Sequence, residues 1–279
     1  MRFATRIAAT RGVNAVGGFV VRRLLVGRSD VEIGQRRVFA RAVRFPIRAG
    51  FAEVELADGI RGVVHAPSAP YLYWAGPSAI EPDLASAFLA AACAARTVVD
   101  VGANFGFYSL LAAKVNPAAH VVAIEPNPQM AAILAETIAR NAAQIEIHEV
   151  ALSDRAGVAE LSLAGGLSSL DRARWPPATP VARVETRRFD DVVDGPVDVV
   201  KIDAEGAEGA ILEGMRRTLE CDRPIVFCEV SAESRRAVLA AVERVGYRAR
   251  MLPGRAELEP EVPAATVVTA VLEPEERNG

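Results

Sequence analysis

One stretch in the first half of the chain constrains the fold more than any other. Residues 98–101 form a short apolar run that contains Asp100 and stops at Gly102, and a helical pattern begins after Gly106. A strand, a tight turn and a helix in this order let the backbone approach a ligand closely at the carboxyl end of the strand. The stretch therefore predicts a ligand-binding turn in an α/β domain.

A second acid follows at the end of the next apolar run. Residues 121–124 lead into Glu125, which lies 19 positions beyond Gly106. In a nucleotide-binding α/β unit, an acid at this place can accept hydrogen bonds from both hydroxyls of a ribose. The two features together predict a cofactor that contains a nucleoside.

The turn itself limits which cofactor this is. It has the form Asp100-x-Gly102-x-Asn104-x-Gly106, without the Gly-x-Gly-x-x-Gly pattern of a dinucleotide site. Asparagine tolerates a positive φ, so Asn104 can stand where another chain has glycine. An acid beside the turn disfavours a pyrophosphate and favours a cationic ligand. S-adenosylmethionine, with a sulfonium, an ammonium, a ribose and no phosphate, satisfies these conditions.

Strand and helix patterns alternate along most of the chain. Strands are expected near residues 97–102, 120–125, 144–150, 197–202, 224–229, 246–252 and 265–271, and helices near 78–95, 106–115, 128–141, 206–219 and 232–245. This alternation predicts an α/β fold with a doubly wound, mainly parallel, seven-stranded sheet. No helix separates the last two strands, so they can pair antiparallel, with the last strand inserted in the sheet. Between about residues 151 and 196 the rhythm changes, and residues 165–172 and 175–177 form an irregular stretch of the kind that is usually functional or mobile.

The first part of the chain has a different character. Residues 1–50 contain eleven arginines and two acids, and the apolar runs 53–56 and 60–64 flank Ala57-Asp58-Gly59, a hairpin signal. We expect residues 1–75 to form a basic N-terminal arm with a helix and a β-hairpin. The arm could pack on its own domain or on a partner subunit in a homo-oligomer, contact an anionic surface, or be disordered.

The apolar stretches and the cysteines indicate the cellular compartment. No stretch approaches the roughly 18–20 apolar residues of a membrane span, and no secretory signal is evident. Cys93, Cys221 and Cys228 are odd in number and lack metal-ligand spacing, so we expect buried free thiols in a reducing compartment. These observations predict a cytoplasmic protein without a transmembrane segment.

Five segments in a fixed order resemble the FkbM-type family of S-adenosylmethionine-dependent O-methyltransferases. They are VVDVGANFGFYSLLAAK (98–114), AIEPNP (123–128), EVALSD (149–154), VDVVKIDAEGAE (197–208) and FCEV (227–230). The first motif is shared by many methyltransferases, and its combination with residues 201–208 is the specific part. The resemblance implies a class I, Rossmann-like methyltransferase domain over residues 76–279.

The resemblance also implies roles for individual residues at the cofactor. The set comprises Asp100, Gly102, Asn104, Gly106, Glu125, Ser153 and Asp154. The first three would line the methionine portion, and Glu125 would hold the ribose hydroxyls. The loop with Ser153 and Asp154 would frame the adenine, although Asp154 could equally cap that loop.

The catalytic candidates are Asp203, Lys201 and Glu205, near the end of the fourth predicted strand. A hydroxyl that accepts a methyl group must lose its proton, which calls for a positioned base or a metal. Asp203, Glu205 and Glu229 should converge at the carboxyl ends of adjacent strands, where α/β folds place ligands. They could hold Mg²⁺ or Mn²⁺, an alternative that the sequence does not favour. Lys201 should pair with Glu229 or Asp203, because an unpaired buried ammonium is costly.

For the acceptor, the resemblance implies a hydroxyl on a sugar, a polyketide or a related natural product, with no nucleic acid. The candidate substrate residues are Tyr73, Trp74, Ser169, Arg172 and Glu229. Two other functions stay open. One is a non-catalytic scaffold or regulator that binds S-adenosylmethionine, and the other is a nicotinamide-dependent oxidoreductase, against which the missing glycine pattern argues.

Overall fold

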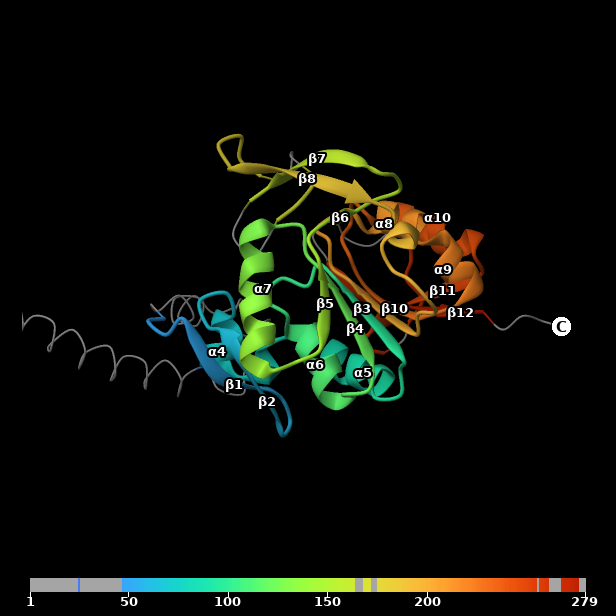
Figure 1. Cartoon of the computed structure of the whole chain (residues 1–279). Helices are drawn as coiled ribbons and strands as arrows, with labels where there is room; N and C mark the ends of the chain where they lie inside the picture. The colour runs from blue at the N-terminus through green and yellow to red at the C-terminus, as the bar shows by residue number, and fades with distance from the viewer. Residues whose placement is uncertain are drawn as a thin grey trace, which may run out of the picture. The chain divides into compact units, whose positions relative to one another are not determined.

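The computed structural model describes residue 25 and residues 47–163, 168–171, 175–254, 256–260 and 267–275. The chain forms two compact units, Met1–Pro82 and Asp83–Gly279 (Figure 1). Most of the predicted basic arm lies outside the described residues. None of the described helices is both long enough and apolar enough to cross a membrane.

The smaller unit contains the predicted hairpin. Strands β1 (Phe51–Ala57) and β2 (Ile60–His65) pair antiparallel around Gly59, whose φ is +72°. Helix α4 (Pro70–Ala75) and the 3-10 turn η1 (Pro77–Ala79) follow, and Trp74 packs with Leu25 in a small apolar cluster. The prediction of a turn at residues 57–59 is confirmed.

The larger unit is built on a seven-stranded sheet in the order β11-β12-β10-β9-β3-β4-β5. The strands are β3 (Thr97–Val101), β4 (His120–Ile124), β5 (Ile145–His148), β9 (Val199–Ile202), β10 (Ile225–Val230), β11 (Tyr247–Leu252) and β12 (Val268–Pro274). Strand β12 lies between β10 and β11 and runs antiparallel to both. The neighbouring pairs from β10 to β5 are parallel, so the predicted sheet, including its inserted last strand, is confirmed.

Helices cover both faces of this sheet (Figure 1). They are α5 (Pro82–Ala92), α6 (Phe107–Val115), α7 (Pro128–Asn141), α8 (Glu208–Gly214), α9 (Arg216–Cys221) and α10 (Arg235–Arg244). Alternate strand residues such as Val99 and Val200 pack with Ile211 and Val238 from the α8–α10 side. On the other face Ala123 packs with residues of α7, and α5 and α6 meet the sheet through Phe88, Tyr108 and Phe227.

Two helix predictions need correction. Helix α5 begins at Pro82 rather than at residue 78, because Pro77 starts a separate short turn and Glu81 has a φ of +35°. The helix expected over 206–219 is two helices, α8 and α9. At the end of α8, Gly214 lies so close to the chain that a Cβ there would be 2.2 Å from the carbonyl oxygen of Ser153.

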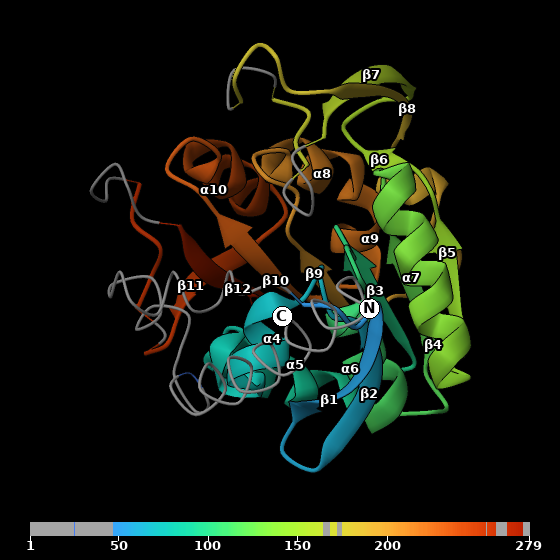
Figure 2. The same cartoon turned by 90° about the vertical axis from the view of Figure 1, so that its left-hand side faces the viewer.

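No strand is predicted between 151 and 196, but this stretch contains a second sheet. Strands β6 (Ala151–Leu152), β7 (Gly157–Ser162) and β8 (Val181–Arg187) pair in the order β6-β8-β7. Figures 1 and 2 show this small sheet beyond one end of the central sheet. The strand expected over 144–150 ends at His148, and the chain then crosses into the small sheet. Strands β7 and β8 are half exposed, so they lack the long apolar runs of β3 and β4.

The cysteine prediction holds for one residue of three. Cys228 is buried in β10, whereas Cys93 and Cys221 are exposed. Both exposed cysteines lie at helix ends, Cys93 just after α5 and Cys221 as the last residue of α9.

Candidate functional site

A cavity opens where the carboxyl ends of β3, β4 and β9 meet. The empty space in it, counted together with the open solvent at its mouth, is about 680 Å³. The lining residues are Val101, Gly102, Asn104, Ile124, Glu125, Pro126, Val150, Ala151, Leu152, Leu161, Ser168, Leu170, Asp203, Ala204, Glu205, Ala207 and Ile211. The small sheet therefore closes the cavity from the side opposite the central strands.

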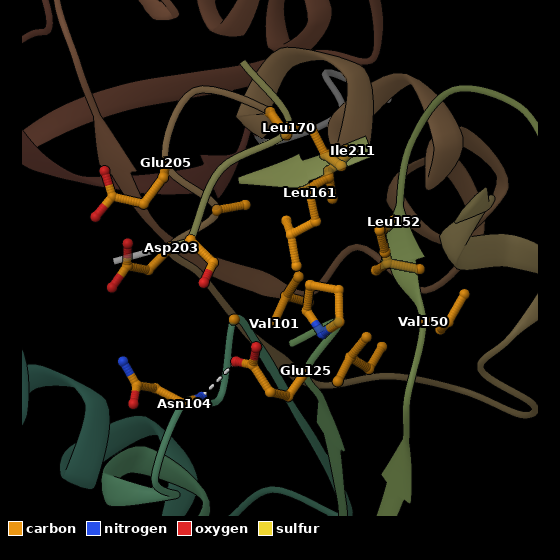
Figure 3. Close-up of a pocket in the computed structure, with 17 residues that line it drawn as sticks. Val101, Asn104, Glu125, Val150, Leu152, Leu161, Leu170, Asp203, Glu205 and Ile211 are labelled. Atoms are coloured by element: carbon orange, nitrogen blue, oxygen red, sulfur yellow. Dashed lines mark hydrogen bonds between the residues drawn. The ribbon is translucent and has the colours of Figure 1, made fainter. Parts of the chain in front are cut away.

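Polar and aliphatic side chains line different parts of the cavity (Figure 3). Asp203 and Glu205 present carboxylates on one side, and Glu125 lies near the middle beside Asn104. Leu152, Leu161 and other aliphatic side chains form the opposite part. An elongated ligand with a polar or cationic end and a flat apolar end matches this distribution.

The turn after β3 has the backbone that its sequence predicts. Gly102, Asn104 and Gly106 all have positive φ, at +74°, +53° and +94°. A Cβ on Gly102 would lie 1.9 Å from the carbonyl oxygen of Asp203, and one on Gly106 would lie 2.6 Å from Leu134 Cδ1. Gly102 thus allows the turn to pack directly on the end of β9.

Glu125 is the most buried of the acids that line the cavity. Its side chain is buried, and its two oxygens accept hydrogen bonds from the backbone N–H of Asn104 at 2.8 Å and of Asn127 at 2.9 Å. Burial raises the pKa of this carboxyl to about 7, against the lowering effect of the two N–H groups; Asp100 raises it further and Lys201 lowers it. Glu125 therefore changes charge near neutral pH.

Asp100 is not among the residues that line the cavity. Successive strand residues face opposite sides of a sheet, so Val101 reaches the cavity while Asp100 faces α6. One oxygen of Asp100 accepts hydrogen bonds from the N–H of Ser109 at 2.9 Å and from its hydroxyl at 2.6 Å. Burial raises the pKa of Asp100, and Lys201 and Ser109 oppose that rise. In this structure the residue anchors α6 to β3.

Lys201 is buried beside these acids. It pairs with Asp100 and Phe227 in the sheet register, and its Nζ lies 3.1 Å from Asp203 Oδ2. The same nitrogen lies 5.0 Å from the centre of the Tyr108 ring, within the range of a cation–π contact. Of the two ion-pair partners that the sequence suggested, the structure shows Asp203.

The predicted convergence of acids is confirmed. Asp203, Glu205 and Glu229 each offer an oxygen within 4.8 Å of the others, and all three are partly exposed. Glu205 has a φ of +50°, an uncommon value for a residue other than glycine. Such a group can accept hydrogen bonds from several hydroxyls at once, and its oxygens also suit a hard divalent cation.

The stretch around Ser169, where the sequence places a substrate candidate, closes part of the cavity, whereas Asn127 behind it was not predicted. Ser168 and Leu170 line the cavity, and the Ser168 hydroxyl accepts a hydrogen bond from Asn127 Nδ2 at 2.8 Å. Asn127 also caps helix α7 by accepting a hydrogen bond from the N–H of Gln129. An asparagine directly before a proline is a helix-start signal that could have identified Asn127.

The remaining predicted residues lie elsewhere or are not described at this site. Ser153 and Asp154 do not line the cavity, because the chain has left the central sheet by then and residues 150–152 occupy that wall. The N–H of Ser153 instead bonds to the carbonyl of Arg187. Arg172 lies outside the described residues, and Tyr73 contacts Trp74 edge to face within the smaller unit.

Comparisons with known proteins were made against families, curated proteins and solved structures. A family model described as the methyltransferase FkbM domain matches residues 100–249. The 2-O-methyltransferase NoeI of Sinorhizobium fredii is 27% identical over 154 residues, which cover 48% of this chain and 63% of NoeI. The chain thus spans less than two thirds of that relative.

Solved structures include methyltransferases with similar folds. The methyltransferase FkbM of Methylobacillus flagellatus is 19% identical with a TM-score of 0.44, over 63% of this chain and 43% of that one. An S-adenosylmethionine-dependent O-methyltransferase of Thermotoga maritima is 11% identical with a TM-score of 0.44, over 72% and 68%.

The buried lysine generates a test of the site's electrostatics. Replacing Lys201 by methionine removes the buried ammonium that faces Asp100 and Asp203, and we expect the free energy of unfolding at pH 8 to fall by about 3–5 kcal/mol. A buried acid whose pKa is raised stabilises the fold when protonated and loses that contribution as pH rises. The loss should therefore be smaller at pH 5, as urea unfolding at both pH values will show.

Lys114→Met is the matched control, because Lys114 is the chain's other lysine and forms no ion pair with the described residues. We expect it to change stability by no more than about 0.5 kcal/mol. Equal losses for Lys201→Met at pH 5 and pH 8 would show that packing, not charge, accounts for the effect.

Proposed function

This chain belongs to the FkbM methyltransferase family, and from that premise we propose that it transfers a methyl group from S-adenosylmethionine to a hydroxyl oxygen of a small molecule or glycan. One observation supports this most strongly. A single cavity joins a buried carboxylate suited to a ribose, Glu125, to a cluster of acids suited to a hydroxyl acceptor.

The residues present fit the cofactor. Each oxygen of Glu125 accepts one backbone N–H and keeps a further lone pair, so both can accept ribose hydroxyls. Leu152, Leu161 and Ile211 offer an apolar wall for the adenine. When bound, the cofactor supplies an electrophilic methyl group on a sulfonium, and the acids around it favour that positive charge.

The same acids disfavour a dinucleotide. A pyrophosphate in this cavity would lie among Glu125, Asp203 and Glu205, and the turn lacks the Gly-x-Gly-x-x-Gly backbone that binds one. This argues against the nicotinamide-dependent alternative. The cofactor site alone would also suit a non-catalytic scaffold. The acid cluster beside that site argues against a scaffold, because its arrangement suits catalysis.

We assign proton removal to Asp203. An acceptor hydroxyl that donates a hydrogen bond to this carboxylate would pass its proton to it as the oxygen bonds to the methyl carbon, whose bond to sulfur would break to leave S-adenosylhomocysteine. Lys201 is a positioning residue, because its ion pair at 3.1 Å orients the Asp203 carboxylate. Glu205 and Glu229 would accept hydrogen bonds from further hydroxyls, which suits a sugar or another polyol.

Measurements of ligand binding and of turnover distinguish the methyltransferase from the scaffold and from the nicotinamide-dependent enzyme. We expect calorimetry to detect binding of S-adenosylmethionine and S-adenosylhomocysteine but not of NAD. In a panel of sugars and other alcohols, release of S-adenosylhomocysteine should identify the acceptor. Asp203→Asn should retain cofactor binding and lower turnover by about a hundredfold or more, the usual contribution of a general base.

Each alternative has its own outcome in that experiment. Tight binding of NAD without binding of S-adenosylmethionine would contradict the proposal. Binding of S-adenosylmethionine without turnover of any acceptor would favour the scaffold. Full turnover by Asp203→Asn would remove Asp203 as the base. Loss of turnover on chelation, restored by Mg²⁺ or Mn²⁺, would favour a metal on the acid cluster.

The pKa of Glu125 predicts how cofactor binding depends on pH. The ribose hydroxyls bond better to the charged carboxylate, so affinity should rise as pH passes through about 7 and level off above it. At one unit below that pKa about a tenth of the sites are ionised, so calorimetry should find roughly tenfold weaker binding at pH 6 than at pH 8. Glu125→Gln cannot ionise and should bind weakly at both pH values; a flat wild-type profile would contradict this role.

A further inference from the structure

Residues 168–171 connect the two halves of the site. We propose that Ser169 is a positioning residue that couples occupancy of the cofactor cavity to the placement of Glu205, so that the cofactor prepares the acceptor side. The inference rests on the proposed function and extends it, because it assigns an order to binding and a task to a residue that does not line the cavity.

The first half of the connection starts at the ribose carboxylate. Glu125 accepts a hydrogen bond from the N–H of Asn127, and the side chain of Asn127 donates to the Ser168 hydroxyl at 2.8 Å. Asn127 is only 1% exposed and is also held by its capping bond to α7. A ligand that moves Glu125, or that fills the space beside Ser168, therefore affects the position of residues 168–171.

The second half reaches the acid cluster. The Ser169 hydroxyl donates to the carbonyl oxygen of Glu205 at 2.7 Å and accepts from the N–H of Asp171 at 3.0 Å. Ser169 is 1% exposed, and its backbone bonds to that of Ser162 in β7. The hydroxyl thus links the cover of the cofactor cavity to the backbone beside the acids.

Glu205 needs such support because its backbone is strained. A residue other than glycine adopts a φ of +50° at a cost in free energy, and it keeps that conformation only where the surrounding structure holds it. Gly206, which follows, also has a positive φ, at +105°. Without the bond from Ser169, we expect this segment to relax and the Glu205 carboxylate to leave the cluster with Asp203.

The cofactor can strengthen this connection. Ser168 and Leu170 line the cavity on either side of Ser169, so a bound ligand contacts both neighbours and stabilises their position. A ligand that fixes the position of Ser169 also fixes the position of Glu205. By linkage, an acceptor held by Glu205 should raise the affinity for the cofactor by the same factor by which the cofactor raises the affinity for the acceptor. Catalytic geometry at the acid cluster would then form fully only when the cofactor is present.

Hydrogen exchange with S-adenosylhomocysteine as the probe tests this in the full chain. In the wild type we expect the ligand to slow exchange over residues 203–208 by about tenfold, within the usual range of coupling between sites. In Ser169→Ala this protection should fall below about threefold, while protection of the turn at 102–106 and ligand affinity stay within about threefold of wild type. Ser169→Thr, which keeps the hydroxyl, should restore it.

Ser162→Ala is the matched control. Ser162 is fully buried and bridges Ser169, but its hydroxyl makes no hydrogen bond with the described residues, so its loss should leave the protection unchanged. Protection at 203–208 that survives in Ser169→Ala would overturn the proposal. So would its loss in Ser162→Ala, or a Ser169→Ala variant that also loses protection at 102–106, because each indicates a structural role only. If the wild type shows no ligand protection anywhere, it is the proposed function that fails.

Discussion

The site depends on one close approach between two strand ends. The turn after β3 packs on the end of β9 so tightly that a Cβ on Gly102 would lie 1.9 Å from the carbonyl oxygen of Asp203. That contact brings the ribose-type acid of β4 and the acids after β9 into one cavity. A larger residue would separate the strand ends, and with them the two halves of the site.

The second constraint is the burial of carboxylates around one lysine. Asp100, Glu125 and Asp203 gather around Lys201, the one lysine in the core of the described sheet, and burial raises the pKa of both Asp100 and Glu125. The region therefore favours a cationic ligand, because such a ligand offsets carboxylate burial that the protein leaves only partly compensated. A sulfonium cofactor meets this requirement, whereas a phosphate would add to the repulsion.

Much of this follows from local sequence, because strands buried on both faces have long apolar runs and turns with positive φ require glycine or asparagine. The central sheet, the turn at 102–106 and the Lys201–Asp203 pair are accordingly as predicted. The small sheet was missed because its strands are half exposed and their pairing is distant in sequence. Ser169 was expected to contact substrate, but its hydroxyl bonds to a backbone carbonyl, a contact that no pattern in the chain reveals.

The proposed function depends above all on Glu125 holding a ribose inside the cavity closed by the small sheet. A crystal structure with S-adenosylhomocysteine would test this role. Both ribose hydroxyls should lie within about 3.2 Å of the Glu125 carboxylate oxygens, with the adenine against Leu152 and Leu161. A ligand bound outside this cavity, or a ribose held by other residues while Glu125 faces away, would contradict the account.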